Sequence, residues 1–406
     1  MVFSTGSSIM KRVFGLVLIL GLLFLVVCFR SVYTSDKIAK IIPVNPEKSL
    51  DGIPLSSLVS NVNYVFLEET SGSVIGAIDK VLVREDKYFI LDREIAKGVF
   101  CFNSKGKFLF KIDDIGRGPG QNIKITDFSL GEDKIYIFDA SGKKISVYSM
   151  SGGFLKAIPI NASGKEFHYT QGQFLIHADY TPNADFQKNN SLFNLLVFNK
   201  EGVINSTYLP YNINVRTSLV LSGINYTFPN EDGSILVREP YSERLFRYGN
   251  SFEPAYEIDF GQKNKELGQE IRGKVLTDSN QSFESVSEKI FNSRFCELIM
   301  IAENSMVVFF AWKRQDDLHY TWFYKEDGTI VSAKRSKSDA MSKGNPLPVD
   351  NDIDGVMFMT IVGAKENSFI SWTYPALIPK KDGMTIPQTD NPVLCILNYK
   401  TKYHEK

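Results

Sequence analysis

The feature that most constrains the fold is an internal repeat in the first half of the chain. Residues 78–92 lie over residues 125–139 at an offset of 47, and both segments contain Glu-Asp-Lys and end in Asp. At an offset of 46 the match continues, with residues 97–112 lying over residues 143–158. Each copy holds four short apolar segments separated by polar or glycine-containing turns, as antiparallel strands do. Four strands per repeat predict the blade of a β-propeller.

Weaker copies of the second and third strands of a blade follow, at Gly172, Gly233, Ser305 and Asn367, so that six such hairpins can be recognised. Their mean spacing is about 56 residues, which exceeds the ~40–45 residues of a compact WD40 blade. The excess falls in insertions, chiefly residues 262–292, which include a short capped helical pattern. The second strands are expected to end near Asp92, Asp139, Ala178, Arg238, Trp312 and Trp372.

The two ends of the chain complete the ring in this interpretation. Strand patterns at residues 61–69 and 391–400 are expected to share a blade, because an open ring would expose unpaired strand edges. We therefore predict an all-β fold, a six-bladed β-propeller with four-stranded antiparallel blades over residues 51–403, preceded by an N-terminal hydrophobic helix. Seven blades of about 48 residues are the alternative.

Residues 1–30 indicate where the protein is located. Lys11 and Arg12 precede an uninterrupted apolar run of 17 residues, 13–29, which Arg30 ends. This run is longer than the core of most export signals and just long enough to span a bilayer as a helix. Residues 1–30 are thus a signal anchor or a lipoprotein signal, and residues 31–50 are a linker. The positive flank predicts a propeller outside the cytoplasm, in the periplasm or at the cell surface, anchored to the membrane.

Cys28 is the candidate site of lipid attachment. Residues 25–28 resemble the lipobox of bacterial lipoproteins, although Val27 is larger than the Gly, Ala or Ser that usually precedes the cysteine. The alternative is a plain anchor in which Cys28 serves as a small apolar residue.

Charge and composition exclude several classes of protein. The chain has 46 Lys and Arg against 46 Asp and Glu, and residues 31–406 carry a net charge of −3. A nucleic-acid partner is not expected, because nucleic-acid binders carry a basic excess. The four His and four scattered Cys include no C-x-x-C or H-E-x-x-H motif, so neither a zinc site nor a disulfide framework is predicted.

The turns between second and third strands supply the candidate binding residues, because these turns open on one face of a propeller. They mix charged and aromatic side chains, which suit stacking on a sugar ring or holding a peptide. The alternative is that the aromatic residues cover blade edges. The candidates are Trp312, Arg314, Trp372, Tyr374, Tyr241, Tyr180, Asp179 and His177.

His177 and Asp179 are two apart in a predicted strand and so share one face. They could bind a metal or act as an acid/base pair, but nothing nearby in the sequence completes such a site. A structural hydrogen bond between them is the favoured interpretation.

Asp350, Asp352 and Asp354, followed by Gly355, match the start of a calcium-binding loop. The twelfth position of the loop, normally Glu, is Ile361. The alternative is an Asx-type turn with solvated carboxylates. Ca2+ is the one cofactor that the sequence suggests.

Several segments resemble a known family. NYVFLEE (residues 63–69), GKFLFKIDDIGRGPGQ (106–121), YEIDFG (256–261), DNDIDG (350–355) and NPVLCILNYK (391–400) are similar to segments of the six-bladed β-propeller proteins abundant in Bacteroides and its relatives. Many members of that family are predicted envelope lipoproteins. The resemblance implies the fold and an envelope location, and it implies no activity.

Two functions are consistent with these observations. The first is a non-enzymatic, membrane-tethered propeller that binds a glycan, peptide or partner protein through one disc face. The alternative is an envelope enzyme, lactonase-like or lyase-like, with a metal and carboxylates at the central channel. Three or more Asp, Glu, Asn or His side chains converging on the channel mouth would favour the enzyme, and an apolar channel with an aromatic outer face would favour binding.

Overall fold

The computed structural model describes residues 39–215, 225–230, 232–278, 280–336, 347–379 and 389–404. The chain divides into two units, Met1–Ala39 and Lys40–Lys406, and the fold below is that of the second. The predicted hydrophobic helix and Cys28 lie outside the described residues. No helix within the described ranges is long and apolar enough to cross a membrane.

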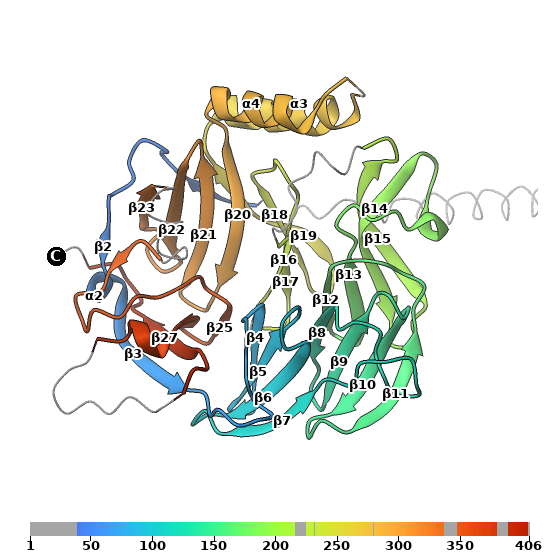
Figure 1. Cartoon of the computed structure of the whole chain (residues 1–406). Helices are drawn as coiled ribbons and strands as arrows, with labels where there is room; N and C mark the ends of the chain where they lie inside the picture. Colours follow the sequence, from blue (N-terminus) through green and yellow to red (C-terminus); the bar gives the residue numbers. More distant parts are fainter. Residues whose placement is uncertain are drawn as a thin grey trace, which may run out of the picture. The chain divides into compact units, whose positions relative to one another are not determined.

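The described residues of the second unit form six four-stranded blades, as predicted (Figure 1). The strands of the first three blades are, from inner to outer, β4 (Lys80–Arg84), β5 (Lys87–Asp92), β6 (Gly98–Asn103) and β7 (Phe108–Ile112); β8 (Asp127–Leu130), β9 (Lys134–Asp139), β10 (Lys144–Ser149) and β11 (Phe154–Pro159); and β12 (Glu166–Thr170), β13 (Gln173–His177), β14 (Ser191–Asn199) and β15 (Ile204–Asn212).

The other three blades repeat this order. Their strands are β16 (Thr227–Pro229), β17 (Ile235–Arg238), β18 (Arg244–Tyr248) and β19 (Phe252–Asp259); β20 (Cys296–Glu303), β21 (Val307–Arg314), β22 (Asp317–Tyr324) and β23 (Ile330–Ser336); and β25 (Gly363–Lys365), β26 (Ser368–Thr373), β27 (Val393–Tyr399) and β3 (Val59–Phe66).

The core lies between neighbouring blades, where aromatic side chains pack among a larger number of aliphatic ones. Phe138 of β9 stacks on Phe167 of the next blade with ring centroids 5.5 Å apart, and Phe309 of β21 lies 5.9 Å from Phe369 of β26. The middle strands are almost wholly buried, whereas the outer strand β11 is mostly exposed. The aromatic residues of the sequence therefore serve mainly to pack one β-sheet against the next.

The ring closes as predicted, through strands from the two ends of the described chain. β3 pairs antiparallel with β27, with Val65 opposite Leu394 and Val62 opposite Leu397. Because β3 is the outermost strand of the sixth blade, that sheet has its full complement of four strands.

Three short strands lie outside the four-stranded repeat of the blades: one joins a blade, and the other two form a separate two-stranded sheet. β1 (Lys40–Pro43), inside the segment predicted as a linker, is a fifth strand parallel to β19. β2 (Ile53–Pro54) pairs with β24 (Val349–Asp350), and α2 (Leu55–Leu58) leads from β2 into β3. The single-turn helices are η1 (Ala184–Phe186), η3 (Val275–Thr277) and η4 (Pro375–Leu377).

Two helices fill the insertion before β20 (Figure 1). α4 (Phe283–Ser293) confirms the predicted capped helix, since Ser282 and Ser285 form a capping box at its start. α3 (Gln262–Gly273) was not predicted. Its Gly268 lies against the turn after β17, where an added Cβ would be 2.4 Å from the Tyr241 carbonyl oxygen.

Candidate functional site

The inner strands of all six blades line one cavity of about 580 Å3, at the centre of the ring. Charged residues lie near both ends of these strands: Lys80 begins β4, while Arg84 and Lys365 end β4 and β25. Between them the lining includes Leu82 and Met300. The cavity therefore combines apolar walls with polar groups toward its ends, as small-molecule sites do.

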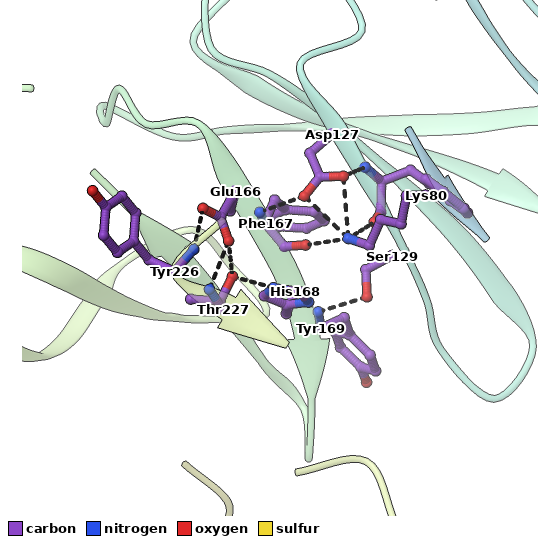
Figure 2. A network of polar contacts seen from close by, with 10 residues as sticks. Lys80, Asp127, Ser129, Glu166, Phe167, His168, Tyr169, Tyr226 and Thr227 are labelled. Carbon is purple, nitrogen blue, oxygen red and sulfur yellow. Dashed lines mark hydrogen bonds and ion pairs between the residues drawn. The ribbon is translucent and has the colours of Figure 1, made fainter. Parts of the chain in front are cut away.

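A network of buried polar contacts joins three neighbouring inner strands (Figure 2). The Lys80 ammonium of β4 lies 3.1 Å from both carboxylate oxygens of Asp127 and donates to the carbonyl oxygens of Phe128 (2.9 Å) and Phe167 (3.3 Å). Asp127 also accepts from the Phe167 amide at 2.7 Å. Neighbouring inner strands do not pair with each other, so these side chains supply partners that their backbone groups need.

Glu166 repeats this arrangement at the next blade. Its Oε1 accepts from the Tyr226 amide (2.8 Å), and its Oε2 accepts from the amide (2.7 Å) and hydroxyl (2.5 Å) of Thr227 (Figure 2). Burial raises the pKa of Glu166, and hydrogen bonds from Thr227 and Tyr226 oppose that shift. Acidic residues do converge at the channel, as the enzyme hypothesis required, but the buried carboxylates of Asp127 and Glu166 are held by donors of the fold.

Three lining residues keep a buried polar atom that has no hydrogen-bond partner in the described part of the chain: Arg93 Nε, His168 Nδ1 and Asn230 Oδ1. Burial, followed by the charge of Lys80, lowers the pKa of His168 well below its usual range, so the imidazole is neutral. Buried polar groups are nearly always paired, and an unpaired one commonly marks a missing water or ligand.

Four predicted binding residues are buried, so they do not form the exposed face that the sequence suggested. Trp312 has no exposed surface; its ring stacks on His319 at 3.8 Å, and its Nε1 donates to Thr321 at 3.0 Å. Tyr180 and Tyr241 pack in one apolar cluster with residues of α3 and α4. These aromatic side chains therefore pack in the interior of the protein and are not available on its surface.

His177, the fourth buried residue, has a structural environment. Its Nδ1 accepts from the backbone amide of Asp179 at 3.2 Å, and its ring stacks on Tyr226 with centroids 5.0 Å apart. Burial lowers the pKa of His177 to about 3, so this histidine is neutral near pH 7. The expected link between His177 and Asp179 thus runs through the Asp179 backbone.

The other predicted face residues retain some exposure but are scattered. Arg314 pairs with Glu47 at 2.7 Å. Trp372 and Tyr374 meet edge to face with centroids 5.1 Å apart, and Tyr374 is 41% exposed.

The predicted calcium loop forms turns whose carboxylates already have protein partners. Asp352 accepts from the Ser56 amide (2.9 Å) and hydroxyl (2.5 Å), and Asp354 accepts from the Tyr64 hydroxyl (2.6 Å). Asn351 Oδ1 accepts from the backbone amide of Ile353, which is the expected Asx-type contact. Among the residues that the structure describes, no group of three or more His, Cys, Asp or Glu is placed to hold a metal ion.

Sequence reasoning missed the channel network, although the repeat contained a signal for it. At the offset of 47 residues, Lys80 lies over Asp127, so the first position of the inner strand carries opposite charges in neighbouring blades. Glu166 and Thr227 begin the next two inner strands, and both are polar. A comparison of the same repeat position across blades would have found all four residues.

Comparisons with known proteins identify the family and the fold. The chain belongs to the family described as a domain of unknown function, DUF4934, whose model matches residues 39–398. The resemblance to six-bladed propellers of Bacteroides is confirmed by a solved structure of a putative exported protein from Bacteroides fragilis, with 14% identity and a TM-score of 0.66, covering 89% of this chain and 100% of that one. No curated protein matches the sequence.

Two further solved structures are more distant. A member of the DUF4221 family from Bacteroides vulgatus has 8% identity and a TM-score of 0.45, covering 84% of this chain and 97% of that one. Virginiamycin B lyase from Staphylococcus aureus, solved with quinupristin, has 12% identity and a TM-score of 0.43, covering 83% of this chain and 100% of the lyase. Neither likeness bears on function.

Proposed function

We propose that this chain is a non-enzymatic binding protein of the cell envelope that holds a small polar ligand in its central channel. One observation carries the proposal: a cavity lined by all six inner strands, with charged side chains such as Lys80, Arg84 and Lys365 near the ends of those strands. The cavity volume of about 580 Å3 falls within the range of roughly 300–1,000 Å3 that small-molecule sites occupy.

Binding is favoured over catalysis because the channel carboxylates already serve the fold. Asp127 and Glu166 accept hydrogen bonds from Lys80, from Thr227 and from backbone amides. A carboxylate that acts as a general base or metal ligand needs an oxygen free to contact the substrate or ion. Each carboxylate oxygen of Asp127 and Glu166 already accepts a hydrogen bond from the protein. The convergence of acidic residues on the channel favours the enzyme alternative, but the two carboxylates at its centre are not free to act on a substrate.

The envelope location has two supports. The 17-residue apolar run at residues 13–29 suits an export signal or an anchor, with lipid attachment at Cys28 as one form of the anchor. The similar propeller from Bacteroides fragilis is described as a putative exported protein. Mass spectrometry of the mature N-terminus distinguishes an acylated Cys28 from an intact anchor.

Thermal unfolding of the full-length chain tests the channel site. Neutral sugars, amino acids, short peptides and diamines are each added at millimolar concentration, and a ligand that binds the folded state raises the unfolding midpoint. Ala302→Phe places a ring in the cavity and should abolish that rise. The matched control is Ala157→Phe on the exposed outer strand β11, which should retain it.

Two results would contradict the proposal. One is a panel in which no compound raises the midpoint. The other is a compound whose effect is the same in Ala302→Phe and in the unaltered chain, since such a compound binds outside the channel.

A further inference from the structure

The helical insertion between β19 and β20 leaves two large apolar side chains in solvent. Phe283 and Phe291 of α4 are 50% and 43% exposed, and they lie in one row along the helix, because residues four apart share a side. A different side of α4 packs on the blades, where Val286 is buried in the apolar cluster beneath the insertion and Ile290 lies against that cluster. The two phenylalanines are therefore available to a partner.

Other exposed apolar side chains lie at the same end of the disc. The insertion, which lies outside the ring of blades in Figure 1, joins the last strand of one blade to the first strand of the next, so it belongs to the end where first strands begin. The loops at this end hold seven further exposed apolar side chains: Val74, Ile95, Ile115, Ile123, Ile213, Tyr374 and Leu377.

The opposite end of the disc is different. Among the described residues, Val203 is the one exposed large apolar side chain in a turn at that end, and the remainder lie on or beside outer strands. Single exposed apolar side chains are common on proteins, but their concentration at one end points to a partner there.

The anchored segment of the chain joins the propeller beside this insertion. The apolar run ends at residue 29 and β1 begins at Lys40, and residues 30–39 between them can span at most about 40 Å. β1 runs parallel to the last residues of β19, directly before α3, and Glu47 lies 3.6 Å from Arg294, which follows α4. A bilayer that holds the apolar run is therefore within reach of the exposed phenylalanines.

The charges on α4 favour apolar contact with lipid over attraction to anionic headgroups. Glu284 and Glu288 are exposed, and Lys289 pairs with Glu270 at 2.6 Å. A helix that binds anionic lipid by charge has a basic face, and α4 has none. Two phenylalanines bind a bilayer weakly by themselves, but a tether raises the local concentration of lipid so that a weak contact suffices.

We propose that the end of the disc that carries α4 docks on the bilayer in which the chain is anchored, with Phe283 and Phe291 inserted among the acyl chains. This inference rests on the membrane anchor of the proposed function, and it adds a contact made by the propeller itself and an orientation. The opposite mouth of the channel, where Arg84 and Lys365 end their strands, then faces away from the membrane and stays open to a ligand.

Tryptophan quenching tests this orientation with the full-length chain in vesicles of phosphatidylcholine whose acyl chains are brominated. Phe283→Trp and Phe291→Trp should each lose at least about half of the added emission relative to vesicles without bromine, also at high salt. The matched control is Val203→Trp, whose position is 59% exposed at the opposite end and which should not be quenched. The emission of the unaltered chain is subtracted in each case.

Photo-cross-linking of the unaltered chain gives a test that needs no substitution. A phosphatidylcholine with a diazirine at the end of one acyl chain should label the peptide that contains residues 283–291 and should leave the peptide around Val203 unlabelled. Equal labelling of both peptides, or labelling of neither, would overturn the inference.

The failures of the two proposals can be told apart. If the chain floats with the vesicles but Phe283→Trp and Phe291→Trp are not quenched, the anchor holds and the docking is overturned; a blue shift without quenching would assign the phenylalanines to a protein partner instead. Equal quenching of Val203→Trp would also overturn the docking, since no end of the disc would be preferred. If the chain does not float with vesicles, the anchor and the docking both fail, and the channel is judged by the thermal test alone.

Discussion

Lys80 and Asp127 show how a single buried pair can hold neighbouring blades together. The side chains are 13% and 3% exposed and lie 3.1 Å apart, and both also contact the backbone of the third blade. Removing one member of a buried pair leaves the other charge without compensation, which usually costs more than the intact pair contributes. The pair therefore specifies how three inner strands are arranged around the channel.

We expect Asp127→Ala to lower the free energy of unfolding by about 3–5 kcal/mol, because it leaves the Lys80 ammonium buried among carbonyl oxygens. Chemical denaturation gives this value directly. The matched control is Asp133→Ala, whose carboxylate pairs with Lys134 on the surface and is 77% exposed, and which should cause no measurable change. Equal effects of the two substitutions would show that the channel pair is not a structural link.

Among the elements, α3 depends on one close approach to the blades. Gly268 lies against the Tyr241 carbonyl oxygen, and the Arg272 guanidinium donates to the same oxygen. At the start of the helix, the Asn264 amide donates to Glu243 at 2.9 Å. Contacts at both ends thus dock the helix.

Gly268→Ala should weaken this docking, because the new Cβ would lie 2.4 Å from backbone oxygen. In a helix open to solvent, Gly→Ala normally stabilises by up to about 1 kcal/mol, so a loss of stability isolates the contact with Tyr241. Hydrogen exchange should become faster across α3. Gly273→Ala on the same helix, where a Cβ meets nothing within 4 Å, should keep exchange slow. Slow exchange in both variants would argue against the contact.

Glu243 should make stability depend on pH. Burial raises its pKa from 4.5 to about 7, and the Asn264 hydrogen bond opposes that shift. A folded-state pKa above the unfolded value stabilises the protein at low pH, and this contribution is lost as pH rises through 7. We expect Glu243 itself to lower the unfolding free energy by about 1–2 kcal/mol between pH 5 and 8, after allowance for solvent screening. The buried histidines act in the opposite sense, because burial lowers the pKa values of His168, His177 and His319. The Glu243 contribution is therefore measured as the difference in slope between the unaltered chain and Glu243→Gln.

Glu243→Gln should remove the Glu243 contribution and keep that of Glu297, which pairs with Arg238 at 3.5 Å and whose pKa burial also raises to about 7. Glu266→Gln, exposed on α3, is the control and should leave the slope unchanged. A slope that is the same in Glu243→Gln and in the unaltered chain would contradict the assignment.

The elements also show which parts of the fold could be predicted. The blades could be predicted because every second residue of a strand points to the same face, so that buried strands have a recognisable apolar pattern. β5 and β9 lie at the positions that the repeat predicted. α3 could not be predicted in this way, because only Gly268 and Ile271 of its residues are buried. Its docking depends on the Tyr241 carbonyl oxygen, which belongs to the preceding blade. Four of the predicted face residues are buried for a related reason, since the burial of a side chain such as Trp312 depends on neighbouring strands that a local pattern does not include.

For the whole molecule, the closure of the ring is where the two ends of the described chain meet. β3 completes the sixth blade, and the loop at residues 350–355 adds side-chain links to the same segment. Asp352 holds the Ser56 amide and hydroxyl, and Asp354 accepts the Tyr64 hydroxyl. Burial, and then the Asp354 carboxylate, raises the pKa of Tyr64, so that the phenol keeps its proton and remains a donor. These aspartates join residues that are 290 or more apart in sequence.

This use of the aspartates predicts how the calcium hypothesis will be decided. A chelator should leave the thermal midpoint of the full-length chain unchanged, because Asp352 and Asp354 stabilise the closure through protein donors and need no ion. Asp352→Ala should lower the unfolding free energy by about 0.5–1.5 kcal/mol, because it removes the acceptor for the Ser56 amide and hydroxyl.

Asp350→Ala is the discriminating control. Asp350 would be the first ligand of a calcium loop, yet its carboxylate, unlike that of Asp352, accepts no hydrogen bond within the described ranges, so its loss should change the midpoint little. In a calcium site the same substitution would remove a ligand and act as strongly as Asp352→Ala. A midpoint that falls with chelator, together with equal effects of Asp350→Ala and Asp352→Ala, would establish a bound cation. It would contradict the view that direct hydrogen bonds from these aspartates stabilise the closure of the ring.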